Sequence, residues 1–423
     1  MRLNSMEQGV EPPNREGFER PAIAQHDFAG VALLCAMTLS MGLAMAFVMP
    51  YTSLFALRET GMAIGMYGLM SLLGAIGAIG CTIGCGILAD RTGRRIEIAV
   101  SCLLAGAIAF VLLCLTKTPL ILFLVTVSLQ AAFNAAPAQM LALSKVFTDT
   151  WTKEHASQGM GLVRAAFSLA WAIGPILGAN LLSNGGFTWV FGTSAVLCVL
   201  AAYLTTRLAS TNVSSEKRES QGGSIFKLLL ATKQLRIYFF AVAIFSLCSN
   251  INLIALPLLL ADVKDGTQTI GHLFGFSAVA ECVLMLVLAI PLGHQKAANM
   301  LCLGAISYGI YLTGVVWAGS ERIAMLFGLQ LLNALATTIF MLVGVLAFQE
   351  ITPNSPGVST GLFASALTTG TILHGPVFSL VYSQFGAKAP FLTGAILCIS
   401  MSILLLITGM SAKSKPNLSA TGS

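Results

Sequence analysis

Charged residues are scarce in this sequence. Asp, Glu, Lys and Arg make up 9% of its 423 residues, whereas hydrophobic residues make up 56%. A soluble globular protein carries about 25% charged residues, so this composition excludes a soluble globular protein. The mean hydropathy of +0.84 agrees with this conclusion. The chain is predicted to cross a membrane many times, and its length suits about twelve helices of about 20 residues with short loops.

Sites for metals, nucleotides and catalysis are also missing. The ten cysteines all fall inside predicted spans. Cys81 and Cys85 are one helical turn apart, but no His or carboxylate joins them, so packing explains them better than a metal. The phosphate-binding pattern G-x-x-x-x-G-K-[ST] does not occur, nor does a cluster of catalytic polar residues. We expect no cofactor, no metal and no enzymatic activity.

The net charge of +6 does not indicate nucleic-acid binding, because the charges lie in loops that flank apolar segments. A membrane surface explains them better. Residues 1–28 are polar and contain proline, so no cleavable signal peptide is expected.

Twelve apolar segments are predicted to span the membrane, as helices because every backbone group must be paired inside lipid. They are residues 29–50, 66–89, 97–115, 119–143, 159–183, 187–206, 236–260, 271–293, 298–317, 322–348, 358–381 and 389–410. The fold class is an all-α polytopic membrane protein with two pseudo-symmetric six-helix bundles. The expected divisions are a cytoplasmic tail (1–28), a first bundle (29–206), a cytoplasmic linker (207–235), a second bundle (236–410) and a cytoplasmic tail (411–423).

The two halves resemble each other. Similar groups recur about 200 residues apart, namely Gly174-Pro175 with Gly375-Pro376, and Gln130 and Asn134 with Gln330 and Asn333. This repetition indicates a duplicated six-helix unit whose copies pack about an axis along the membrane normal. With the N-terminus in the cytoplasm, 17 Lys and Arg residues fall on the cytoplasmic side and five on the other. The positive-inside rule therefore favours cytoplasmic termini.

A ten-residue loop joins the second and third predicted spans. Its glycine and charged positions are Gly86, Asp90, Arg91, Gly93, Arg94 and Arg95. This pattern, G-x-x-x-D-R-x-G-R-R, resembles the signature loop of the major facilitator superfamily. We expect Asp90 to close the cytoplasmic side by meeting the N-terminus of the eleventh helix near Gly357 and Ser359, where the helix dipole favours an anion. The alternative is a basic anchor that only orients the helices.

The fifth span carries a second pattern of small residues. It comprises Gly161, Ala170, Gly174, Pro175, Gly178 and Ala179. It resembles the antiporter signature of facilitator-superfamily exporters, G-x8-G-x3-G-P-x2-G-G, with alanine at two glycine positions. Small residues let a partner helix approach closely, and the proline bends the span. The alternative is a kinked packing face without directional meaning.

A narrower resemblance extends from about residue 41 to 386. It rests on Ser168–Pro175 after Arg164, Gly328–Ala334, Gln139–Leu143, Pro50 with Ser53–Phe55, Phe348–Glu350 with Pro353, and Glu281. These segments resemble the bacterial sugar efflux transporter family. The resemblance implies export of small sugars and glycosides in exchange for protons, across the inner membrane of a bacterium.

Ionisable residues inside spans are costly, so they mark a cavity or a partner. Glu281 is the only acid well inside a span, and it can load and release a proton as access alternates; the alternative is a structural carboxyl. Arg164 either reaches back to the cytoplasmic surface, binds sugar, or pairs with Glu281. His374 precedes Gly375 and either binds a hydroxyl, titrates, or is simply hydrogen-bonded.

Uncharged amides provide the expected sugar site, because they supply both donors and acceptors. They are Gln130, Asn134, Asn250, Asn252, Gln330 and Asn333. Trp171 can stack on a pyranose face. Hydrogen bonding between helices is the competing role for these amides.

The sequence thus predicts a secondary transporter that exports sugars or glycosides by proton antiport. Its partners would be a small-molecule substrate, protons and membrane lipids, with no nucleic acid, and we expect a monomer. The alternatives are a multidrug or other small-molecule exporter of the same fold, sugar uptake, and a polytopic sensor or membrane enzyme. Val127, three residues before Gln130, stands where drug/proton antiporters carry an arginine.

Overall fold

The structure is a computed structural model that describes residues 28–148, 151–208, 233–293, 296–352 and 356–411. The predicted terminal tails, and most of the linker predicted between the bundles, lie outside these residues. Within the described ranges there are only helices and short connections, and no strand. The expectation of an all-helical protein is confirmed.

In the first half of the described chain, several predicted spans are divided into shorter helical pieces. These are α1 (Phe28–Val48), η1 (Met49–Tyr51), α2 (Thr52–Leu54), η2 (Phe55–Glu59), α3 (Ile64–Thr92), α4 (Arg95–Leu115), α5 (Pro119–Val125), η3 (Thr126–Gln130), α6 (Ala131–Phe133), α7 (Ala136–Thr148) and α8 (Lys153–Leu208). The helix α8 spans 56 residues, but Gly186 has non-helical angles (φ 66°, ψ −168°) and divides it. The fifth and sixth predicted spans are therefore the two arms of α8.

The second half contains longer uninterrupted helices. These are α10 (Lys233–Leu260), α11 (Gly266–Gly293), α12 (Ala297–Ala318), α13 (Ile323–Ile351), α14 (Pro356–Phe385) and α15 (Ala389–Ser411). Within the described residues, ten helices are long and apolar enough to cross a membrane. One of the ten is the divided α8, and α14 is not among them. All twelve predicted segments nevertheless coincide with helical structure.

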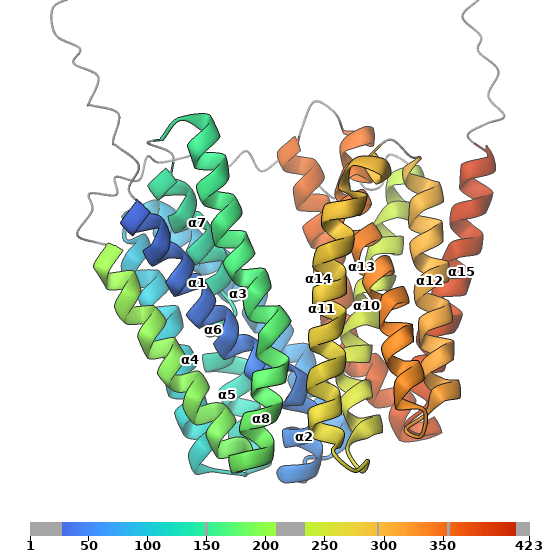
Figure 1. Cartoon of the computed structure of the whole chain (residues 1–423), viewed down its shortest axis with the longest axis horizontal. Helices are drawn as coiled ribbons and strands as arrows, with labels where there is room; N and C mark the ends of the chain where they lie inside the picture. The colour runs from blue at the N-terminus through green and yellow to red at the C-terminus, as the bar shows by residue number, and fades with distance from the viewer. Residues whose placement is uncertain (1–27, 149–150, 209–232, 294–295, 353–355, 412–423) are drawn as a thin grey trace, which may run out of the picture.

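Two groups of helices stand side by side in Figure 1, with α1–α8 in one and α10–α15 in the other. They meet at one end, which we call the joined end, and diverge toward the end where α3 passes into α4, which we call the basic end. At the joined end, the Ser53 hydroxyl donates to the Ile254 carbonyl at 3.1 Å, and Arg58 pairs with Asp262 at 2.8 Å.

Glycines allow the two groups to touch closely where α3 crosses α14. A β-carbon placed on Gly375 would lie 2.4 Å from the β-carbon of Ser71, and one on Gly68 would lie 2.5 Å from that of Ser379. The Ser379 hydroxyl also donates to the Ile64 carbonyl at 2.9 Å. Only glycine fits at these two positions, so a side chain at either would force the two helices apart.

Aromatic side chains fill the interior of each group. In the first group, the Phe55 and Phe191 rings pack edge to face with centroids 4.7 Å apart. In the second, the Phe245 and Phe340 rings stack with centroids 4.2 Å apart. These large buried side chains make each group a packed unit, so a movement between the groups disturbs less packing than a movement within one.

Candidate substrate cavity

A cavity of about 850 Å³ lies between the two groups of helices. Its walls come from α1, η1, α2, α3, α4, η3 and α6 on one side and from α10 and α14 on the other. This volume falls within the range of about 300–1,000 Å³ that is usual for small-molecule sites.

Half of the residues that line the cavity are polar, but they are uncharged amides, hydroxyls and a histidine. They are Thr52, Ser53, Tyr67, Ser71, Thr82, Thr126, Gln130, Asn134, Asn250, Ser365, Thr368, Thr369, Thr371 and His374. Within the described part of the chain, none of the lining residues is Asp, Glu, Lys or Arg. Such a lining suits a neutral ligand with many hydrogen-bonding groups.

Two lining amides have one half of the group engaged and the other half available. The Thr126 hydroxyl donates to the Gln130 Oε1 atom at 3.0 Å, which leaves the Gln130 NH2 group for a ligand acceptor. The Asn250 Nδ2 atom donates to the Ser246 carbonyl at 2.8 Å, which leaves the Asn250 Oδ1 atom for a ligand donor. Since these residues come from opposite groups of helices, a ligand hydroxyl network can join both sides.

A stripe of hydroxyls on α14 was not predicted from the sequence. Ser365 donates to the Gly361 carbonyl at 2.8 Å, Thr369 to the Ser365 carbonyl at 2.8 Å, and Thr371 to the Leu367 carbonyl at 3.1 Å. Each proton is used within the helix, so the oxygens face a ligand as acceptors. The sequence signal was the recurrence of Ser and Thr at intervals of three and four residues.

The remaining lining is apolar and comes mainly from the first group. Met45, Met49, Met70, Phe110 and Phe133 contribute to it. Methionine adapts to irregular shapes, and aromatic rings can stack on sugar faces. The cavity therefore has a polar wall on α14 and α10 and a more apolar wall on α1, α3 and α4.

Three of the six predicted amides, Asn252, Gln330 and Asn333, lie in the second group and are not among the residues that line this cavity. Asn333 donates to Gln330 Oε1 and to the Ser277 hydroxyl, both at 2.9 Å. Gln330 donates to the Tyr311 hydroxyl at 3.4 Å, which donates to Asn252 Oδ1 at 3.0 Å. This buried network of hydrogen bonds joins α10, α11, α12 and α13. It is the alternative role considered for these amides, hydrogen bonding between helices.

The predicted ionisable and aromatic residues also separate. His374 lines the cavity, and its Nδ1 atom contacts the Thr371 carbonyl. Trp171 lies outside the lining and packs against Phe167 with centroids 6.4 Å apart. Arg164 on α8 is exposed and Glu281 on α11 is half-buried. Neither lines the cavity, and neither has an ion-pair partner among the described residues.

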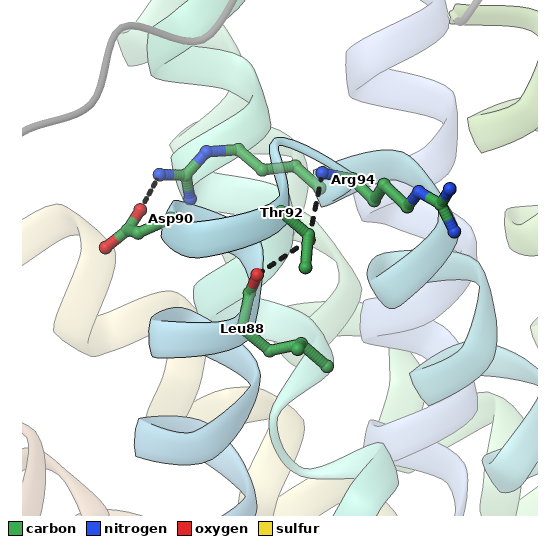
Figure 2. Close-up of polar contacts among 5 residues, drawn as sticks. Leu88, Asp90, Thr92 and Arg94 are labelled. Atoms are coloured by element: carbon green, nitrogen blue, oxygen red, sulfur yellow. Dashed lines mark hydrogen bonds and ion pairs between the residues drawn. The ribbon is translucent and has the colours of Figure 1, made fainter.

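Most of the predicted ten-residue loop is helical, because residues 86–92 form the end of α3, and only Gly93 and Arg94 make the turn to α4 at the basic end (Figure 2). Gly93 ends α3 in a left-handed conformation (φ 73°), and its N–H donates to the Ala89 carbonyl. The Thr92 hydroxyl donates to the Leu88 carbonyl at 2.7 Å and accepts from the Arg94 N–H at 3.3 Å.

Asp90 pairs with Arg95 rather than with the start of α14, where Ser359 bonds Thr352 at 2.6 Å. Among the residues that the structure describes, no ion pair joins Asp90 to α14 near Gly357, and the two groups of helices diverge at this end in Figure 1. Arg91 and Arg94 are exposed. The gating role of Asp90 stays a prediction for a state in which the basic end closes.

The glycine pattern of α8 packs only in part. A β-carbon on Gly174 would lie 2.4 Å from Ala46, and one on Gly178 would lie 2.9 Å from the Phe47 carbonyl, both in α1. Nothing lies within 4 Å of such an atom on Gly161, nor on Gly86 of the signature loop. The close approach to α1 therefore involves Gly174 and Gly178, and the Pro175 carbonyl accepts from the Tyr51 hydroxyl of η1 at 2.8 Å.

Long apolar helices around an uncharged polar cavity define a multi-pass membrane transporter. The sequence profile of the Major Facilitator Superfamily matches residues 34–320. The chain belongs to this family.

Curated relatives and solved structures agree with that assignment. Sugar efflux transporter A of Escherichia coli (strain K12) is 28% identical over 364 residues, which cover 85% of this chain and 91% of that protein. Its counterpart in Dickeya chrysanthemi is 27% identical over 374 residues, 85% of this chain and 92% of that protein. The structure also resembles the crystal structure of the nucleoside transporter NupG, with a TM-score of 0.73 at 15% identity over 92% of this chain and 100% of that one.

Proposed function

We propose that the chain exports small sugars or glycosides across the bacterial inner membrane, by alternating access and in exchange for protons. The relatives named above support the substrate class and the direction. The observation that carries the proposal is the cavity lining, which offers amides, hydroxyls and one histidine and, among the described residues, no acid and no Lys or Arg. A neutral polyhydroxylated ligand satisfies such a lining without burying an unpaired charge.

The proposed architecture has twelve spans in two pseudo-symmetric bundles, with both termini in the cytoplasm. The basic end carries Arg91, Arg94 and Lys145, which the positive-inside rule places at the cytoplasmic side. The structure then represents a state open to the cytoplasm and closed at the joined end. An exporter would load its substrate in this state.

Proton coupling is assigned to Glu281. One proton that moves down about 100 mV contributes about 2.3 kcal/mol, and one pH unit adds about 1.36 kcal/mol. The sum of about 3.7 kcal/mol sustains a gradient of a neutral sugar of roughly 500-fold. In Glu281→Gln we expect proton-driven export to stop, while sugar counterflow, which needs no proton gradient, continues at a lower rate.

Counterflow of labelled sugars and glycosides into proteoliposomes tests the substrate site. Asn250→Ala removes an acceptor from the cavity, and we expect about a tenfold weaker sugar affinity because one hydrogen bond to the ligand is lost. Asn299→Ala is the matched control, because Asn299 is an exposed amide outside the lining. Equal sugar affinities in the two variants would contradict the assignment of the cavity as the sugar site.

A second candidate function is export of neutral lipophilic compounds. It is favoured by the apolar wall that contains Met45, Met70 and Phe133. Counterflow of a labelled apolar neutral compound in the same vesicles distinguishes this candidate from sugar export. Counterflow of that compound without any counterflow of sugars would support this candidate and refute sugar export.

A further inference from the structure

The contact between α8 and α11 crosses from one group of helices to the other. A β-carbon on Gly271 would lie 2.6 Å from the Pro175 carbonyl, and one on Gly275 would lie 3.0 Å from the Ala172 carbonyl. The helices run antiparallel here, because α8 leads from the basic end to the joined end and α11 leads back. Their contact fixes the register in which the remaining lengths of both helices would meet.

Arg164 and Glu281 lie on the same side of this contact. From Gly275 to Glu281 the axial rise is about 9 Å, and from Ala172 to Arg164 it is about 12 Å, both toward the basic end. The two residues are thus within about 3 Å of the same level, less than one helical turn. They belong to the part of the seam that is open in this structure, where α8 and α11 diverge in Figure 1.

Both side chains also point away from lipid. The exposed apolar residues Leu169 and Ile173 mark the lipid face of α8, and Arg164 lies about 180° around the helix from Ile173. Val279 and Val283 mark the lipid face of α11, and Glu281 lies about 160° from each. Arg164 lies about 20° around α8 from Pro175, whose carbonyl is part of the contact with α11.

We propose that Arg164 and Glu281 form an ion pair when the basic end closes. This assignment deepens the proposed transport function by giving Arg164 the role of a positioning residue. Bringing α8 and α11 together at this level would bury the exposed Arg164 side chain and the rest of the half-buried Glu281 side chain. An unpaired charge buried there opposes closure. Paired, each charge compensates the other, and the described residues supply no other partner for either in the open state.

A charge exchange tests the pair in purified protein. In Glu281→Arg two positive charges meet at the seam, and we expect sugar counterflow to fall by about tenfold or more. Adding Arg164→Glu restores opposite charges and is expected to bring counterflow back to within about threefold of the unmodified protein. Lys145→Glu added to Glu281→Arg is the control: it changes the net charge equally at an exposed position of the same end and should restore nothing.

Hydrogen–deuterium exchange gives a readout that needs no substrate. Arg164→Ala, at an exposed position, should fold and should increase exchange of residues 157–170 and 279–288, because the closed basic end becomes less populated. The pair is refuted if Arg164→Ala leaves that exchange unchanged and Arg164→Glu fails to rescue Glu281→Arg. If the unmodified protein moves no sugar, the proposed function fails, and the exchange of the single and double variants still decides the ion pair.

Discussion

Replacing Gly375 by alanine should shift the balance between the two open states. The new β-carbon would lie 2.4 Å from the Ser71 β-carbon and 2.9 Å from the Gly68 carbonyl. Ordinary contacts between such atoms begin near 3.4 Å, so α3 and α14 must separate by about 1 Å at the joined end. Overpacking of this kind costs about 1–3 kcal/mol, which disfavours the observed state about 5- to 150-fold relative to one that is open at the joined end.

Hydrogen–deuterium exchange of the joined-end parts of α3 and α14 measures this shift. Gly375→Ala should raise the exchange rate there. Gly80→Ala is the matched control on α3, because nothing lies within 4 Å of a β-carbon at that position. Exchange in Gly375→Ala that equals the exchange in Gly80→Ala would show that the close crossing of α3 and α14 does not hold this end together.

Three further outcomes follow from the contacts described. Asn333→Leu leaves buried polar partners unsatisfied. In soluble proteins each unsatisfied buried group costs about 1–3 kcal/mol of stability, but hydrogen bonds between membrane helices contribute on average only about 0.6 kcal/mol. We therefore expect a Tm only a few degrees lower, and an unchanged Tm would refute a stabilising role. Arg58→Ala should change counterflow less than about fivefold, because the exposed pair with Asp262 is worth at most about 1 kcal/mol; a complete loss would contradict this. Asp90→Asn should slow counterflow by up to about 30-fold, the limit for a charge at a helix N-terminus, and an unchanged rate would remove Asp90 from the gate.

The helices were predictable because each span is encoded by its own run of apolar residues. The predicted last span, 389–410, coincides with α15 at Ala389–Ser411. The bend at Gly186 was expected only as a boundary between two spans. Its sharpness depends on one backbone conformation (φ 66°, ψ −168°) that glycine alone adopts readily.

The site was less predictable because it depends on what each helix face meets. Gln330 and Asn333 are three residues apart, so a shared face was foreseeable. The sequence did not show that this face meets Tyr311 and Ser277 rather than the cavity. The hydroxyls of α14 carried a weak signal, since Ser and Thr in helices often only bond their own backbone.

The bend in α8 has a consequence for how the protein enters the bilayer. Gly186 joins the two arms of α8 without an intervening loop, and Trp189 closes tightly over Gly185, where a β-carbon would lie 2.1 Å from its ring. Such a hairpin leaves almost no polar chain between its arms. We expect the fifth and sixth spans to be inserted together during biosynthesis, as a single helical hairpin, and a side chain at Gly186 to impair assembly before it impairs transport.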